Sequence, residues 1–149
     1  RDFCLSRGLG DVYKRQLNCE YVSLETLLRE SDVVSLHCPL TEQTRGMIGK
    51  EQLAMMKPNA IIVNEARGAV IDDKALVEAL QNGTIWGAAI DTWEKEPLDP
   101  NDPLVKMEKV ITTSHLGAAT RETVIRCFSI GYQNILRQIH GEELVNRIV

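Results

Sequence analysis

A strand, a loop and a helix follow one another between residues 60 and 82, and this stretch constrains the fold more than any other. Residues 61–63 are a short β-branched run, which favours a buried strand. The second part opens with Asp72, an acidic N-cap, continues with apolar residues at helical spacing, and stops before Gly83. Arg67 lies in the loop between them, at the position where open α/β sheets bind their ligands. The stretch therefore predicts an α/β protein with a cation at the ligand-binding edge of its sheet.

The same alternation of strands and helices continues along most of the chain. Apolar and β-branched runs predict strands at residues 33–37, 61–63, 84–93 and 110–113. Capping residues and helical periodicity predict helices that begin after Ser23, at Lys50, after Asp72 and after Thr120. Parallel strands joined by helices form sheets that are covered on both faces. We therefore expect an α/β fold with a partial Rossmann-type, doubly wound parallel sheet.

Two features of the third strand and the loop after it carry further expectations. Small residues around Gly87 are expected to let a helix pack closely on the sheet. Residues 94–108 are polar and contain several acidic residue–proline pairs, which predicts an irregular loop.

Charge and cysteine content exclude several classes of protein. The formal net charge of −4 comes from 17 basic and 21 acidic residues, so no basic field indicates nucleic acid or an anionic membrane surface as a partner. No apolar run approaches the length of a membrane span. The four cysteines, Cys4, Cys19, Cys38 and Cys127, show neither CxxC pairing nor metal-ligand spacing. We therefore expect no metal site and a reducing, cytoplasmic environment.

Several residues able to carry chemistry follow the predicted strands directly or lie on the loop after one. They are Cys38, Pro39, Arg67, Asp91, Glu96 and His115. Because the carboxyl ends of parallel strands share one edge of a sheet, these residues can converge on a single cleft.

Each candidate has a chemical interpretation and a structural one. Arg67 presents a planar fork that fits a carboxylate, or it is a surface arginine. His115 could act as a general acid–base, or it is a structural histidine, which is also how we interpret His37. Glu96 could orient His115 and raise its pKa, or it is a solvated glutamate in an acidic loop. Asp91 could accept hydrogen bonds from a cofactor amide, or it caps a turn.

The combination of motifs is more specific than its parts. Asn64-Glu-Ala-Arg-Gly-Ala-Val-Ile-Asp72, Gly87-Ala-Ala-Ile-Asp91, Glu96-Pro97 and His115-Leu-Gly-Ala118 together resemble the D-isomer-specific 2-hydroxyacid dehydrogenases, which include the phosphoglycerate, hydroxypyruvate and D-lactate dehydrogenases. Residues 31–41 also resemble the segment of that family that leads to the adenine pocket. The resemblance covers nearly all of residues 17–149.

The resemblance implies an NAD-dependent enzyme that interconverts D-2-hydroxyacids and 2-oxoacids. It implies three catalytic residues: Arg67 would hold the substrate carboxylate, His115 would transfer the proton, and Glu96 would pair with His115. Asp91 would hold the nicotinamide carboxamide. The remaining cofactor-binding positions that it implies, besides Arg67 and His115, are Cys38, Pro39, Glu65, Ala66, Gly117 and Ala118.

The domain organisation follows from the same resemblance. Residues 11–16 resemble the translated end of a sequencing adapter, so we interpret residues 1–16 as a non-native scar. Residues 17–149 would be the C-terminal part of the NAD-binding domain. Residues 119–149 would be its final helix and a tail leading back to a substrate domain that the sequence does not contain. The glycine-rich phosphate loop would also precede residue 17, so we expect this fragment alone to be inactive.

The sequence differs from the family pattern at two positions of the predicted cleft. Glu65 stands where a small or neutral residue is common, and Ser114 stands where proline is frequent.

An NAD(H)-binding corepressor on the same fold is the main alternative, whereas Glu96 argues against a formate dehydrogenase. The choice between NAD and NADP, the particular 2-hydroxyacid and the oligomeric state stay open, although the family resemblance favours NAD and a homodimer.

Overall fold

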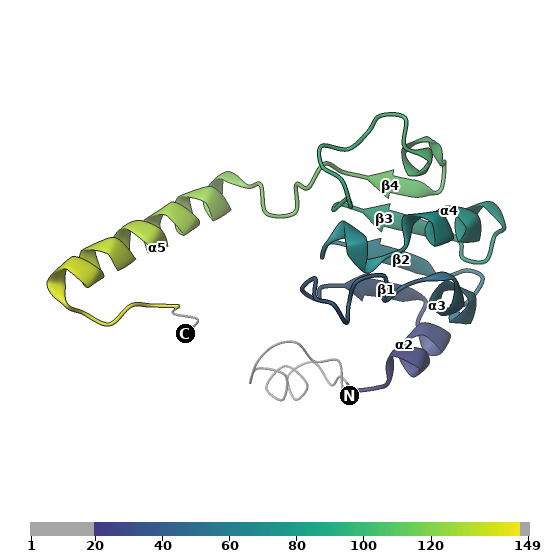
Figure 1. Cartoon of the computed structure of the whole chain (residues 1–149), viewed down its shortest axis with the longest axis horizontal. Helices are drawn as coiled ribbons and strands as arrows, with labels where there is room; N and C mark the ends of the chain where they lie inside the picture. Colours follow the sequence, from purple (N-terminus) through teal and green to yellow (C-terminus); the bar gives the residue numbers. More distant parts are fainter. Residues whose placement is uncertain (1–19, 147–149) are drawn as a thin grey trace. The chain divides into compact units, whose positions relative to one another are not determined.

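The computed structural model describes residues 20–146, which form two units that we treat separately: a sheet body, residues 20–114, and a C-terminal segment, residues 115–146. The interpretation of residues 1–16 lies outside the described residues. The sheet body holds four parallel strands in the order β1-β2-β3-β4 (Figure 1). Their bounds are Val33–Leu36, Ile61–Asn64, Gly87–Ile90 and Val110–Thr112. The predicted parallel α/β sheet is thereby confirmed.

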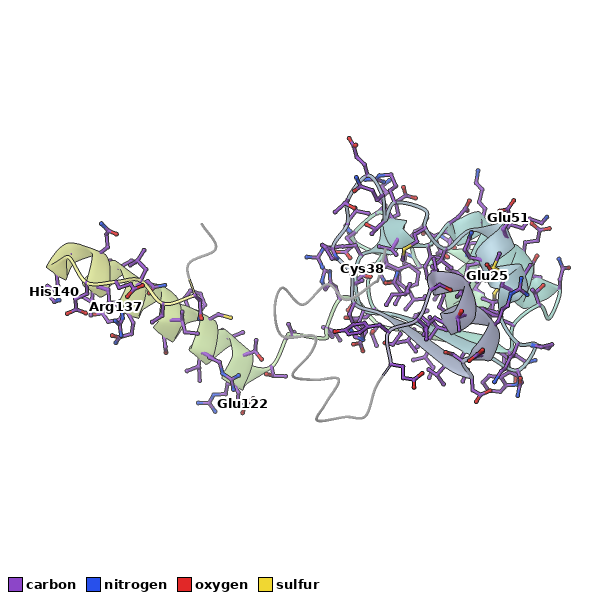
Figure 2. The ribbon with its side chains drawn as sticks, turned by 90° about the horizontal axis from the view of Figure 1, so that it is seen from below. Glu25, Cys38, Glu51, Glu122, Arg137 and His140 are labelled. Carbon is purple, nitrogen blue, oxygen red and sulfur yellow. The ribbon has the colours of Figure 1, made fainter. Side chains whose placement is uncertain are left out.

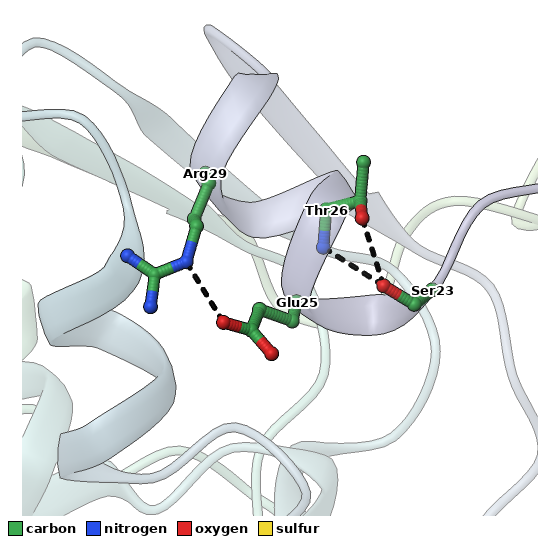
Figure 3. Close-up of polar contacts among 4 residues, drawn as sticks. All are labelled: Ser23, Glu25, Thr26 and Arg29. Carbon is green, nitrogen blue, oxygen red and sulfur yellow. Dashed lines mark hydrogen bonds and ion pairs between the residues drawn. The ribbon is translucent and has the colours of Figure 1, made fainter.

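Helix α2, Leu24–Glu30, begins where the capping pattern predicts. The Ser23 hydroxyl accepts a hydrogen bond from the Thr26 amide at 3.1 Å and contacts the Thr26 hydroxyl at 2.9 Å (Figure 3). Arg29 and Glu25 form an exposed ion pair one turn apart, with 3.0 Å between Nε and Oε1. Exposed pairs of this kind contribute below about 1 kcal/mol, so the N-cap and the burial of Leu28 fix the helix.

The central strand-loop-helix is present as predicted. Helix α4, Asp73–Gln81, starts after Asp72, whose carboxylate accepts from the amides of Lys74 and Ala75 at 3.0 and 3.1 Å. Gly83, just past its end, adopts a left-handed φ of 68°. Two features were not predicted: a 3₁₀ turn η1, Gly68–Val70, and a parallel bridge between Ile48 and Ile71.

The helices of the sheet body lie on one face of its sheet. Each successive strand is added to the same edge of the sheet. Right-handed crossovers between such strands therefore place all the connecting helices on the same face. Buried and exposed positions alternate along β1, and the inward residues of β1, β2 and β3 join one core with α2, α3 (Lys50–Met55) and α4. On the opposite face, Val33 is 56% exposed and Ile111 is 71% exposed.

The third strand is shorter than predicted, and its glycine serves another purpose. Only Gly87–Ile90 pair as β3, although residues 84–93 were expected to be a strand. A Cβ at Gly87 would lie 2.7 Å from the Lys109 carbonyl oxygen, so the close neighbour is the backbone entering β4 and not a helix. The loop 94–108 also contains a 3₁₀ turn, η2 (Pro103–Lys106), whose Leu104 is fully buried and anchors the loop to the core.

The C-terminal segment consists of a short connection and helix α5, Arg121–His140. The Thr120 hydroxyl accepts from the Thr123 amide at 3.1 Å, as predicted, and Gly141 ends the helix in the left-handed region. None of the described side chains of α5 is buried. Among residues 20–146, no helix is long and apolar enough to cross a membrane.

Candidate active site

A cavity of about 480 Å³ lies at the carboxyl ends of β1 and β2. Its lining comes from the two loops that leave these strands: His37, Cys38, Pro39, Leu40, Glu65, Ala66 and Arg67. The strands are parallel and paired in register from Val33 opposite Ile61 to Leu36 opposite Asn64, so both loops leave the same edge of the sheet. The structure therefore brings together five of the predicted site residues.

The loop that carries Arg67 is held by a buried amide. Asn64 is 1% exposed, and its side chain donates to the Arg67 carbonyl at 3.1 Å and accepts from the Ala66 amide at 3.1 Å. The Arg67 guanidinium donates to the Ala66 carbonyl at 2.6 Å while its side chain stays exposed. An asparagine that satisfies the backbone two and three residues ahead makes a tight, defined turn. Asn64 thus fixes the backbone from which Arg67 projects.

Gly68 lets this loop meet the one that follows β3. A Cβ at this position would lie 2.0 Å from the Trp93 carbonyl carbon and 2.1 Å from the Glu94 amide nitrogen. Both neighbours are backbone atoms, so no side chain can move aside for a larger residue. The two loops that carry Arg67 and Glu96 are consequently in direct backbone contact.

Trp93 connects the loops after β3 and β4. Its amide donates to Glu96 Oε1 at 3.2 Å, and its indole donates to the Thr113 carbonyl at 2.9 Å. The Trp93 side chain is buried, whereas Glu96 is exposed. The turn from Trp93 to Glu96 is therefore anchored at its first residue and presents its carboxylate at the surface.

Asp91 lies at the end of β3, where it links three strands. Its backbone amide donates to the Asn64 carbonyl at 3.0 Å, and its carboxylate accepts a hydrogen bond from the Thr113 hydroxyl. With 9% of its surface exposed, the residue is nearly enclosed. Asp91 thus stabilises the carboxyl edge of the sheet, and its proposed contact with a cofactor stays a prediction.

Cys38 is a neutral thiol in this setting. Burial raises its pKa above the ordinary value of 9.0, which more than offsets the lowering by a backbone hydrogen bond. Because the thiolate is the nucleophilic form, Cys38 serves as a packing residue of the cavity wall.

His115, Gly117 and Ala118 belong to the C-terminal segment. His115 follows Ser114 at the end of the sheet body, and its backbone adopts a left-handed φ of 59°, which is unusual for a residue with a side chain. Such a conformation re-aims a side chain and is frequent at functional positions. The pairing of Glu96 with His115 stays a prediction.

Several residues of this edge were not singled out from the sequence. Leu40 lines the cavity, and so does His37, which was interpreted only as a structural histidine. His37 follows β1 instead of lying within it, and its ring lies 2.7 Å from the Ser35 hydroxyl. Asn64 appears in the sequence only as the first residue of the motif that contains Arg67, and the structure shows that its side chain hydrogen-bonds the backbone of the Arg67 loop. Gly68 and Trp93 were also not predicted to shape the site. The signal in the sequence that could have identified them is their position: Gly68 follows Arg67, and Trp93 lies three residues before Glu96. No group of metal-ligating side chains is present among residues 20–146.

A parallel α/β sheet with polar residues gathered at the carboxyl ends of its strands defines a domain of the Rossmann type. The sequence profile described as "D-isomer specific 2-hydroxyacid dehydrogenase, NAD binding domain" matches residues 7–117. The chain therefore belongs to the D-isomer-specific 2-hydroxyacid dehydrogenase family.

Relatives and solved structures agree with this assignment. Glyoxylate reductase of Aeropyrum pernix is 47% identical over 147 residues, which are 97% of this chain and 44% of that protein. Glyoxylate/hydroxypyruvate reductase B of Pectobacterium carotovorum is 43% identical over 129 residues, 87% of this chain and 40% of that protein. The holo form of D-mandelate dehydrogenase from Rhodotorula graminis superposes with a TM-score of 0.86 at 35% identity, covering 97% of this chain and 41% of that one. The chain thus spans less than half the length of these proteins.

Proposed function

We propose that this chain is the cofactor-binding part of an NAD-dependent oxidoreductase that interconverts a small D-2-hydroxyacid and the corresponding 2-oxoacid. The observation that carries the proposal is the placement of Arg67 in a cavity at the carboxyl edge of a parallel sheet. A guanidinium binds a carboxylate through two parallel hydrogen bonds, and every 2-hydroxyacid has a carboxylate. The sequence identity to reductases of glyoxylate and hydroxypyruvate supports the same reaction.

The cavity fits a nicotinamide dinucleotide in its position and its lining. Its lining combines the small or apolar residues Cys38, Pro39 and Ala66 with the charged residue Glu65, and a mixed lining of this kind supports a cofactor site. Asp91, Gly117 and Ala118 complete the set that we propose to hold the cofactor. When bound, the reduced nicotinamide supplies the hydride.

Three residues of the chain are assigned the acid–base and binding roles. Arg67 holds the substrate carboxylate and so fixes the orientation of the carbonyl. His115 donates the proton to the carbonyl oxygen on reduction and accepts it on oxidation, the role of a general acid–base. Glu96 pairs with the imidazole ring and orients it.

The substrate that we favour is glyoxylate or hydroxypyruvate, because the relatives at 47% and 43% identity are named for these compounds. A phosphoglycerate-like substrate is the other member of the class that the sequence resemblance suggested. We further propose that the complete protein is a cytoplasmic homodimer, on the strength of the family resemblance. Light scattering of the purified complete protein tests the dimer.

The test of the reaction is NADH oxidation by the complete protein in the presence of glyoxylate, hydroxypyruvate or 3-phosphohydroxypyruvate. Arg67→Gln should lower kcat/KM about a hundredfold or more, mainly through KM, because the carboxylate loses its bidentate partner. His115→Ala should lower kcat about 10²–10⁴-fold. Arg45→Gln, which removes an exposed arginine that does not line the cavity, is the control. No turnover with any 2-oxoacid would overturn the proposal.

A further inference from the structure

Glu65 and Arg67 present opposite charges to the same cavity. Both follow β2, both are exposed, and the buried Ala66 lies between them. Residues two apart in a chain have Cα atoms at most about 7 Å apart. Both residues also line the cavity of about 480 Å³, so any small ligand bound to Arg67 lies close to Glu65.

Once a substrate carboxylate occupies Arg67, no second cation of the lining offsets the negative charge of Glu65. Among the seven lining residues, the side chains that carry a full charge when His37 is neutral are Glu65 and Arg67. A ligand with one carboxylate uses the single cation. Within residues 20–146, no hydrogen bond or ion pair of the Glu65 carboxylate is found, so its charge is not neutralised by a neighbour.

We infer that Glu65 sets the charge of the substrates that Arg67 accepts, admitting 2-oxoacids with one carboxylate and disfavouring those with a second negative group. This inference rests on the proposed function and deepens it. Because Glu65 and Arg67 line one cavity of about 480 Å³, we expect the second anionic group of a 2-oxoacid of three to five carbons to lie within about one Debye length of the Glu65 carboxylate, about 8 Å at physiological salt. Repulsion between unit charges at about 6 Å lowers binding roughly three- to tenfold in a partly solvated site.

The kinetic test uses the complete protein and compares glyoxylate, a monoanion, with oxaloacetate, a dianion. The measured quantity is the ratio of the two kcat/KM values, because effects on cofactor binding cancel in it. Glu65→Gln should raise the oxaloacetate-to-glyoxylate ratio about three- to tenfold. Glu51→Gln is matched in charge, lies in α3 outside the cavity lining, and should leave the ratio unchanged. Figure 2 shows Glu51 well separated from Cys38 of the cavity.

The salt dependence of the kcat/KM ratio distinguishes an electrostatic effect of Glu65 from a steric one. At 1 M salt the Debye length falls to about 3 Å, so the wild-type ratio should rise toward that of Glu65→Gln, whereas the ratio of the variant should hardly change. A ratio that is equal in wild type and Glu65→Gln, or a difference that does not respond to salt, would overturn the inference.

A binding measurement distinguishes failure of this inference from failure of the proposed function. In the 149-residue chain, the amide resonances of Ala66 and Arg67 report titration with acetate and with malonate. Glu65→Gln should tighten malonate binding relative to acetate by the same three- to tenfold. If the complete protein reduces no 2-oxoacid, the proposed function fails, and the titration alone decides the inference. If turnover is present but Glu65→Gln leaves the ratio unchanged, only the inference fails.

Discussion

The sheet body and the C-terminal segment are built from similar sequence patterns but use them differently. Both have helices with a hydroxyl or carboxylate N-cap and a glycine near the end. In the sheet body, nineteen apolar side chains form one buried core. In the segment, α5 repeats apolar residues along one side and buries none of them: Phe128 is 76% exposed and Ile139 is 70% exposed.

This difference shows which features of the structure depend on packing. Local signals such as caps are sufficient to mark a helix in either region, whereas stability and site geometry come from burial and backbone contact. Matched substitutions in the two regions should therefore have unequal effects. Urea unfolding followed by circular dichroism measures each of them as a change in the free energy of unfolding.

The largest contrast is expected between two glycines. Gly68→Ala should destabilise the sheet body by about 4 kcal/mol or more, because the new Cβ overlaps backbone atoms of Trp93 and Glu94. Gly131→Ala should stabilise α5 by about 0.5–1 kcal/mol, because nothing lies within 4 Å of its Cβ and alanine favours a helix. Equal effects of the two changes would contradict the close contact at Gly68.

The next contrast compares large apolar side chains. Leu76→Ala should cost about 3 kcal/mol, since Leu76 is fully buried and the change leaves a cavity. Phe128→Ala, at a side chain that is 76% exposed, should change the free energy of unfolding by less than about 0.5 kcal/mol. A large cost at Phe128 would show that this face of α5 is covered in solution.

Two asparagines that bind backbone groups provide a third contrast. Asn64→Ala should cost about 2 kcal/mol because it leaves buried groups of the Arg67 loop without partners. In the complete protein it should also raise KM, since the backbone under Arg67 loosens. Asn134→Ala removes the exposed hydrogen bonds to Val145, at 3.0 and 3.1 Å, and should cost below about 1 kcal/mol. A KM unchanged by Asn64→Ala would argue against its positioning role.

The smallest effect concerns the pH dependence of the sheet body. Burial, together with the neighbouring Asp102, Glu94 and Asp72 carboxylates, raises the pKa of Asp73 from 3.8 to about 6. The folded state therefore binds more protons between these values, so stability falls as pH rises from about 4 to 6. Asp73→Asn should flatten this slope and be more stable at pH 7.

The expected gain is of order 1 kcal/mol, because solvent screens this half-buried group and because Asn loses the favourable interaction of a carboxylate with the start of α4. The control is Asp99→Asn, an exposed carboxylate on the neighbouring loop, which should keep the wild-type slope. An unchanged slope in Asp73→Asn would locate the pH dependence elsewhere.

Much of the sheet body could be predicted from local patterns. The strand at residues 61–63, the Asp72 cap and the loop with Arg67 are determined by residues close together in the chain, and the structure confirms them. The extent of β3 could not be predicted, because pairing with β2 and β4 decides where a strand ends. The placement of the sheet body's helices on one face likewise depends on strand order, which no local pattern encodes.

The candidate site divides in the same way. Cys38, Pro39, Glu65, Ala66 and Arg67 follow strands, so their convergence could be predicted from parallel topology. The contact between Gly68 and the Trp93–Glu94 backbone could not, because it joins residues 25 and 26 positions apart whose proximity arises only in the folded sheet. The left-handed backbone of His115 also has no signature in its neighbours.

The position of Trp93 gives the protein an intrinsic optical probe. Its indole is 7% exposed and hydrogen-bonded to Thr113, whereas the other tryptophan, Trp86, is 51% exposed. A shielded indole fluoresces at shorter wavelength than one in water. Trp86→Phe would leave Trp93, whose amide donates to Glu96, as the single tryptophan. Its spectrum would report events at the carboxyl edge of the sheet directly, without a label or a coupled assay.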